Sequence, residues 1–289
     1  MTEHVERTDA PRLGDPIMVA AFEGWNDAGS AASGALEHLE SVWNATEVVA
    51  LDPEDYYDFQ VNRPHVVLDG DRRSIIWPTT RLLTARPPGH DRDVVLVHGI
   101  EPNIRWRAYT EELVDHGKRL GVETVITLAA LLAEVPHTRP VPVSGSALDP
   151  EHRDRLGLER STYEGPTGIV GVLQSACTAE GLPAVSFWAA VPHYVASVAC
   201  PKATVALLRR VEDVLDVSVP LGDLPEQAKT WQESANELVS KDDEIGEYVR
   251  QLEQSKDTAE LPEASGEFIA REFERYLRRQ QEHGPGGES

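Results

Sequence analysis

Short apolar runs alternate with amphipathic stretches over the first two-thirds of the chain. Residues 17–22 and 93–99 are apolar runs, and the second ends in glycine, as strands buried on both faces of a sheet often do. Apolar residues recur at helical spacing in residues 28–39, 106–120 and 202–215. This alternation predicts a three-layer α/β/α sandwich around a mainly parallel sheet.

Further runs complete the predicted sheet. Residues 47–51, 123–131 and 183–191 read as strands, and residues 168–181 read as a helix. Two apolar runs flank an Asp-Gly pair at residues 69–70, which indicates a β-hairpin. The run "RLLTA" follows and is predicted to extend that hairpin. An early hairpin also predicts that the sheet is mixed.

The character of the chain changes toward its end. A proline-rich stretch at residues 135–150 is too long for a simple connector, so we expect it to rim a site or an interface. After about residue 221 charges dominate, and narrow apolar stripes at helical spacing predict amphipathic helices that must dock on something. The predicted organisation is a flexible arm (1–14), a core domain (15–219), a helical appendage (220–282) and a flexible tail (283–289).

Composition narrows the classes of partner. The 289 residues carry a formal net charge of −22, which repels nucleic acid and anionic lipid, so we expect neither as a partner. No apolar run reaches the roughly 20 residues that span a bilayer, and the charged start predicts no signal peptide. The two cysteines have no metal-ligand spacing and the ten histidines are scattered, which predicts a reduced, cytoplasmic chain without metal or cofactor.

The stretch "IMVAAFEGWNDAGSAASGALEHL" predicts a strand, a glycine turn and a helix. A nucleotide triphosphate loop needs Lys and then Ser or Thr where this chain has Ser30 and Ala31. The dinucleotide motif needs glycine where Asn26 stands. Two interpretations remain: a corner capped by Asp27 with Trp25 as a lid, or a ligand contact at the carboxyl end of a strand.

Other polar residues beside glycine or proline follow predicted strands. Because the carboxyl ends of parallel strands meet at one edge of a sheet, we expect these residues to gather there around a ligand-binding cleft. The candidates are Gly24, Trp25, Asn26, Asp27, Glu101, Ser144, Glu164, Gly165, Thr167, His193 and Tyr194.

Each of these candidates also has a structural interpretation. Glu101 is either a base or ribose ligand or a helix cap, and Ser144 is either an anion contact or ordinary loop. Thr167 is a natural N-cap for the helix that follows it. His193 is either a general acid or base or a hydrogen-bonded structural residue. The G-x-S-x-G and H-E-x-x-H motifs are absent, so no catalytic residue is assigned.

Four segments in order, "AFEGWNDAGSAASGALEHL", "HGIEPNIRW", "YEGPTGIVGVL" and "WAAVPHYVA", resemble the proteasome assembly chaperone 2 family, and its actinobacterial members in particular. The resemblance implies a fold similar to purine nucleoside phosphorylases and a homo-oligomer, with a trimer as one option. It implies no catalytic mechanism. Some relatives dock through a C-terminal hydrophobic-Tyr-any tail, from which the ending Gly287-Glu288-Ser289 departs.

Two functions therefore stand side by side. The first is a non-enzymatic assembly or scaffold protein that binds a protein partner such as proteasome subunits. The alternative is a binding protein or enzyme for a nucleoside- or phosphate-like small molecule, held in a cleft at the strand ends. The absence of catalytic motifs and the amphipathic C-terminal stretches favour the first.

Overall fold

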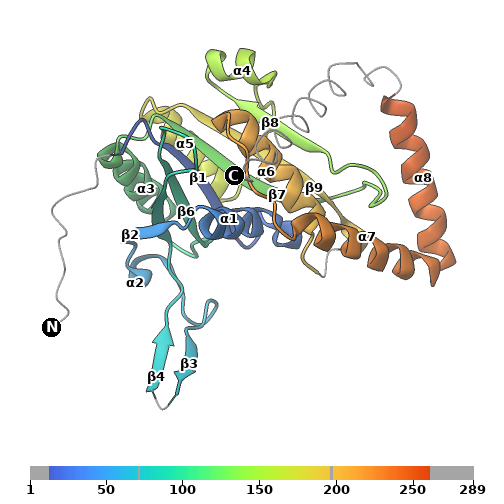
Figure 1. The fold of residues 1–289 in the computed structure, drawn as a ribbon, viewed down its shortest axis with the longest axis horizontal. Helices are drawn as coiled ribbons and strands as arrows, with labels where there is room; N and C mark the ends of the chain where they lie inside the picture. The colour runs from blue at the N-terminus through green and yellow to red at the C-terminus, as the bar shows by residue number, and fades with distance from the viewer. Residues whose placement is uncertain (1–12, 71, 196–197, 261–289) are drawn as a thin grey trace, which may run out of the picture.

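The computed structural model describes residues 13–70, 72–195 and 198–260 (Figure 1). The strands are β1 (Ile17–Glu23), β2 (Thr46–Ala50), β3 (His65–Asp69), β4 (Arg72–Ile76), β5 (Arg81–Ala85), β6 (Val94–Ile100), β7 (Thr124–Ala133), β8 (Val143–Ala147) and β9 (Ala184–Pro192). The helices are α1 (Ala31–Val42), α2 (Pro53–Tyr56), α3 (Trp106–Leu120), α4 (Pro150–Leu156), α5 (Ile169–Ala179), α6 (Pro201–Leu215), α7 (Leu224–Ser240) and α8 (Asp243–Glu260), with short 3₁₀ turns η1 (Ala28–Ser30) and η2 (His193–Val195).

Seven strands form one mixed sheet in the order β2-β5-β6-β1-β7-β9-β8. The four central strands, β6, β1, β7 and β9, run parallel. The outer strands β2, β5 and β8 pair in antiparallel fashion. A parallel centre must be covered on both faces, which explains why its strands are apolar almost throughout. The predicted α/β fold with a mainly parallel mixed sheet is confirmed.

Helices cover both faces of the sheet, and successive residues of β1 point to opposite cores. Val19 faces a core closed by Leu36 of α1 and Leu208 of α6. Met18 faces the second core, to which α3 and α5 contribute Tyr109 and Leu173. All of these side chains are almost fully buried. Two apolar layers on one sheet make the three-layer sandwich that the alternation predicted.

One prediction about the edge of the sheet was wrong. The run "RLLTA" does not extend the hairpin, because β5 pairs with β2 and β6 inside the main sheet. The proline-rich stretch contains the edge strand β8, which pairs with β9. The pairing of β5 and β8 was not visible in the pattern, since both strands are short and their pairing partners lie far away in sequence.

The hairpin around residues 69–70 is present but stands apart from the sheet. Its strands β3 and β4 pair only with each other among the described residues. Figure 1 shows them projecting from the body of the molecule.

The helices after residue 221 dock on the core domain. Trp231 and Ala235 of α7 are buried in the core that α1 and α6 share. Helix α8 is tied to the loop after β7, where Arg139 forms two hydrogen bonds of 2.8 Å with the Asp257 carboxylate. Residues 1–12 of the predicted arm, the last part of the predicted appendage and the predicted tail (283–289) lie outside the described residues. Over the residues it describes, the structure has no helix long and apolar enough to cross a membrane.

Candidate functional site

The turn after β1 is pinned between the two neighbouring strands. Gly24 has φ of 122°, a conformation that favours glycine. On one side the Glu101 N–H donates to the Glu23 carbonyl over 2.8 Å, at the end of β6. On the other side the Ala130 N–H of β7 donates to the Asn26 carbonyl over 2.8 Å. These backbone contacts fix the turn across the carboxyl edge of the sheet.

Asp27 caps α1 with its buried carboxylate. Its Oδ1 accepts hydrogen bonds from the Ala32 N–H at 2.7 Å and the Ser33 N–H at 3.2 Å, and its Oδ2 accepts from the Ser33 hydroxyl at 2.5 Å. Burial raises the pKa of Asp27, whereas the hydrogen bonds from Ser33 and Ala32 lower it. The predicted cap is confirmed, and the positive end of this helix already holds a carboxylate.

Glu101 does the same for α5. Its Oε1 accepts a hydrogen bond from the Asn26 side-chain amide at 2.8 Å and another from the Ile169 N–H at 2.8 Å. Thr167 is not the N-cap that its residue type suggested, because Gly168 holds that position and gives no side-chain hydrogen bond. The side chain that accepts from the first N–H of α5 is instead that of Glu101, the residue after β6. A Cβ on Gly168 would lie 2.3 Å from the Asn26 amide, so only glycine fits there.

A cleft of about 1020 Å³ opens beside this turn. Of the candidates from the sequence, Gly24, Trp25, Asp27, Ser144 and Thr167 line it. Asn26 and Glu101 are not among its lining residues; Asn26 is 1% exposed, and the two are joined by their hydrogen bond. The structure therefore brings together segments from β1, β6, β8 and the start of α5.

Glu164 and Gly165 are exposed and lie in the loop that edges the cleft. Their neighbours Tyr163 and Pro166 line it, but they do not. The Tyr163 hydroxyl donates to the Pro166 carbonyl over 2.9 Å and folds the loop back on itself.

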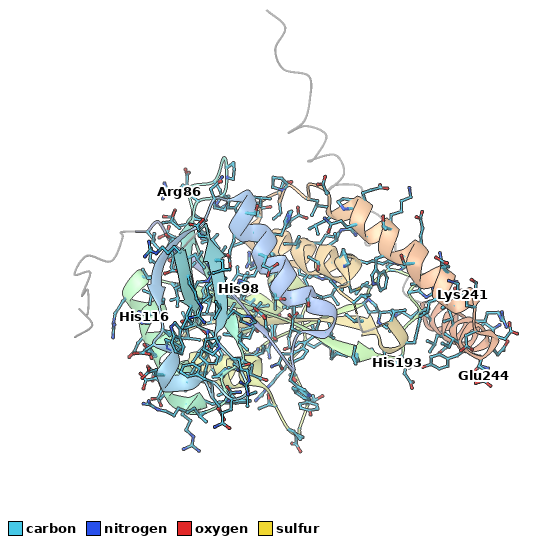
Figure 2. The ribbon with its side chains drawn as sticks, turned by 90° about the horizontal axis from the view of Figure 1, so that it is seen from below. Arg86, His98, His116, His193, Lys241 and Glu244 are labelled. Carbon is cyan, nitrogen blue, oxygen red and sulfur yellow. The ribbon has the colours of Figure 1, made fainter. Side chains whose placement is uncertain are left out.

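His193 and Tyr194 lie elsewhere, against the C-terminal helices. The His137 N–H donates to the Tyr194 hydroxyl over 2.8 Å, and the His137 ring joins Asn236 of α7 at 2.9 Å. The ring of His193 packs edge-on against Tyr194 and Tyr248. Figure 2 shows His193 near Lys241 and Glu244, at the α7–α8 end and far from His98. These two residues join the helical appendage to the core.

Sequence reasoning missed most of the apolar lining of the cleft. Leu131 and Leu132 are 42% and 53% exposed there, beside Trp25 at 70% and Tyr163 at 69%. Apolar residues at the end of a buried strand are expected to lie in the core, so nothing in the sequence indicated that these leucines would be exposed. Trp188 of β9 also lines this cleft.

The polar groups that line this cleft carry both signs of charge. They include serine hydroxyls, the carboxylates of Asp27 and Glu159 and the guanidinium of Arg160. Both helix starts at its edge are neutralised by the chain's own carboxylates, which disfavours a phosphate there. The described residues also hold no cluster of three or more His, Cys, Asp or Glu side chains suited to a metal. The rim of the cleft is aromatic and aliphatic, with Trp25, Tyr163 and Leu131 among its lining residues.

Sheet order and two helical layers define an α/β/α sandwich with a cleft at the carboxyl edge of its sheet. The sequence profile described as the PAC2 family matches residues 21–239. The chain belongs to the PAC2 family, and the resemblance found in its four segments is confirmed.

Solved structures agree with this assignment. A PAC2 family protein from Streptomyces avermitilis is 59% identical, with TM-score 0.78, over 81% of this chain and 100% of that one. A proteasome-assembly chaperone homologue from Mycobacterium tuberculosis is 57% identical, with TM-score 0.74, over 81% of this chain and 99% of that one. An archaeal homolog of proteasome-assembly chaperone from Pyrococcus furiosus, 17% identical over 85% of this chain and 97% of that one with TM-score 0.57, shares the fold. No curated protein matches the chain.

Proposed function

We propose that this protein is a non-enzymatic assembly chaperone that docks proteasome subunits through the hairpin β3–β4. Two similar proteins carry the description of proteasome-assembly chaperone homologues, one of them 57% identical. The observation that carries the proposal for this chain is the hairpin itself, because its apolar side chains are exposed.

The strand register places these side chains on one face. Val66 pairs directly with Ile75, and Leu68 pairs with Arg73, so all four point the same way. Val66 is 50% exposed, Leu68 74% and Ile75 48%. A two-stranded hairpin is only marginally stable alone in water, and an exposed apolar face of this kind marks a protein contact.

Charge and backbone add to this picture. The hairpin region, residues 61–77, contains three arginines and two aspartates, a positive formal balance inside a chain of net charge −22. Its outer strand edges are unpaired among the described residues, so a partner strand could extend it. The expected partner surface is an apolar, acidic edge of a proteasome subunit.

Self-association and a cytoplasmic location belong to the same proposal. A homo-oligomer, with a trimer as the leading option, suits a chaperone that presents several docking arms at once. Mass measurement of the purified full chain by light scattering tests this part separately.

The experiment reconstitutes proteasome α-ring formation from purified subunits of the same organism. The full chain is expected to speed ring formation, and the variant Val66→Ser/Leu68→Ser/Ile75→Ser is expected to lose this effect. These side chains are exposed, so the variant should keep its melting temperature. The matched control is Leu238→Ser, since Leu238 is 46% exposed on α7. Equal acceleration by the triple variant, or none by the natural chain, would refute the proposal.

The cleft supports a second candidate, a small-molecule binding role. Its volume of about 1020 Å³ and its rim of Trp25, Tyr163 and Trp188 suit a ligand with a flat ring, such as the base of a nucleoside. A panel of nucleosides and phosphate compounds, read as an increase in melting temperature, tests it. Trp25→Ala should abolish any increase, because Trp25 is exposed and does not support the core.

A further inference from the structure

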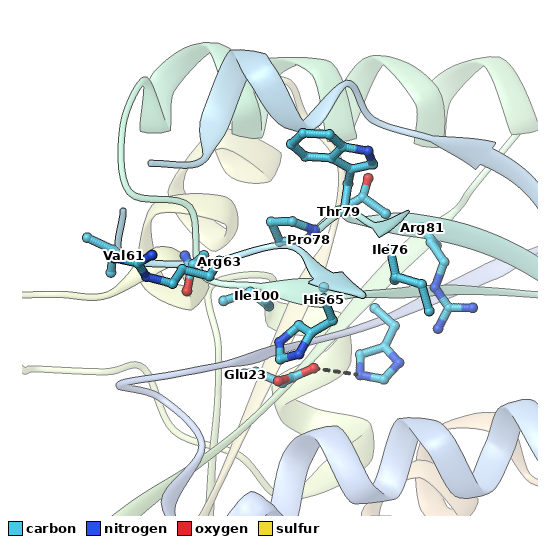
Figure 3. A pocket seen from close by; sticks show the side chains of 13 residues that line it. Glu23, Val61, Arg63, His65, Ile76, Pro78, Thr79, Arg81 and Ile100 are labelled. Carbon is cyan, nitrogen blue, oxygen red and sulfur yellow. Dashed lines mark ion pairs between the residues drawn. The ribbon is translucent and has the colours of Figure 1, made fainter. Parts of the chain in front are cut away.

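A second pocket lies at the base of the hairpin and shares no lining residue with the large cleft. It measures about 460 Å³. The ends of β1 and β6, the start of β5 and the two hairpin stems form its walls (Figure 3).

The most unusual group in its wall is His98. Its side chain is 7% exposed, and Nδ1 lies 2.7 Å from Oε1 of Glu40 on α1. Because an ionised carboxylate only accepts hydrogen bonds, Nδ1 carries the proton and donates it to this bond. The second ring nitrogen, Nε2, is therefore left as an acceptor in the neutral ring. Glu40 is itself held by Arg81, whose Nη2 lies 3.2 Å from Oε2.

Nε2 of His98 is buried without a hydrogen-bond partner. A buried acceptor without a partner destabilises the empty pocket, and a donor that reaches it removes this cost. Glu23 Oε1 lies 3.9 Å away, too far for a hydrogen bond, along the dashed line in Figure 3. Glu23 is itself 53% exposed at the side chain, so it can move as a ligand enters. A donor placed between these two groups would satisfy both of them.

The rest of the wall has different chemistry. Arg63 and Arg81 line the pocket, and Figure 3 shows them on either side of His65. Val61, Ile76 and Trp77 supply an apolar wall. The pocket thus combines an acceptor pole, a cationic pole and an apolar surface.

Burial raises the pKa of Glu23, and the nearby carboxylates of Glu37 and Asp27 raise it further, whereas His98 lowers it only when its ring is protonated. A cation beside Glu23 would relieve this repulsion between carboxylates. The acceptor pole therefore suits a charged donor better than a neutral one.

We propose that this pocket binds a zwitterionic amino acid with an apolar side chain. Its ammonium group donates to His98 Nε2 and the Glu23 carboxylate, its carboxylate pairs with Arg63, and its side chain packs against Trp77 and Ile76. The proposal does not depend on the docking role of the hairpin, because the apolar face in that role lies further out, at Val66, Leu68 and Ile75.

L-phenylalanine is the probe, titrated into the full chain by calorimetry. We expect saturable binding, with affinity lowered at least about tenfold for 3-phenylpropanoate, which lacks the ammonium group, and for L-phenylalaninamide, which lacks the carboxylate. Glu23→Gln and Arg63→Gln should each weaken binding by about the same factor. Glu111→Gln and Arg107→Gln are the matched controls, since both residues are exposed on α3 and neither lines the pocket.

His98→Asn provides the test of Nε2 itself. The Asn amide can still donate to Glu40 from near the position of Nδ1, but it has no group in place of Nε2. Binding should fall at least about tenfold, while the natural chain should show its His98 Nε2 nitrogen resonance moving when L-phenylalanine is added. No saturable binding of L-phenylalanine, binding equal to that of both analogues, or binding unchanged in Glu23→Gln and Arg63→Gln would overturn the proposal.

Discussion

Replacing Glu101 should destabilise the contact between the turn after β1, the end of β6 and the start of α5. In Glu101→Ala both the Asn26 side-chain amide and the Ile169 N–H lose their acceptor, each of them bonded over 2.8 Å in the natural chain. Asn26 is 1% exposed and Ile169 is fully buried, so water cannot easily replace the carboxylate. A hydrogen bond to a charged group is worth about 1.5–3 kcal/mol, and two coupled bonds should therefore cost about 2–4 kcal/mol in the free energy of unfolding.

Glu101→Gln separates the hydrogen bonds from the charge. A single amide oxygen can still accept from both donors, so only the charge next to the start of α5 is lost, at about 1 kcal/mol. Urea unfolding followed by circular dichroism measures both variants, with Glu111→Ala as the exposed control. If Glu101→Ala lowers the free energy of unfolding by less than about 1 kcal/mol, the two hydrogen bonds to Glu101 do not stabilise this contact.

Three further predictions concern packing and pH. Gly168→Ala should lower the free energy of unfolding by about 1–3 kcal/mol, because its Cβ would lie 2.3 Å from the Asn26 amide, whereas Gly34→Ala in α1, with its nearest atom at 3.4 Å, should be neutral or slightly stabilising in the same urea assay. The Arg86 hydrogen bonds hold the pKa of Asp93 below its ordinary value, so this stabilisation is present above pH about 4 and is lost as the pH falls further. Arg86→Met should therefore reduce the loss of stability in acid melting curves, and an unchanged acid slope would contradict the assignment. Burial holds the pKa of His137 below its ordinary value, so the docking of α7 should be complete above pH about 6.5 and weaken below it. Hydrogen exchange of the α7 amides at pH 7.5 and pH 5, corrected for the intrinsic effect of pH on exchange, tests this. Protection of α7 should fall at pH 5 in the natural chain. In His137→Gln the corrected protection should be the same at both pH values.

Local sequence patterns were enough to predict the strands and helices that bury one face or both faces. The central strands β1, β6, β7 and β9 are apolar runs of sufficient length, and α1, α3 and α6 show helical spacing. The Asp-Gly turn fixed the hairpin because its backbone demands are local. Pairing of β5 and β8 depended on partners distant in sequence, and so it could not be read from either strand alone.

The candidate residues divide in the same way. Residues 24–27 follow β1, Thr167 precedes α5 and Ser144 lies within the edge strand β8, and strand order brings these segments together. His193 also follows a strand, β9, but that strand continues past the cleft to the helical appendage. A residue that follows a strand is expected at the edge of the sheet. The length of that strand then decides whether the residue reaches the cleft or lies beyond it.

The sequence alone determined the class of fold, the family and the Asp27 cap, because periodicity, glycine turns and capping act over a few residues. Only the tertiary structure decided that Glu101 caps α5, that His98 has one ring nitrogen bound and the other unpaired, and that the apolar face of the hairpin is exposed. Each of these depends on which groups meet across long separations in the chain. Burial and hydrogen bonding depend on contacts between segments that are distant in sequence, so they cannot be predicted from one segment alone.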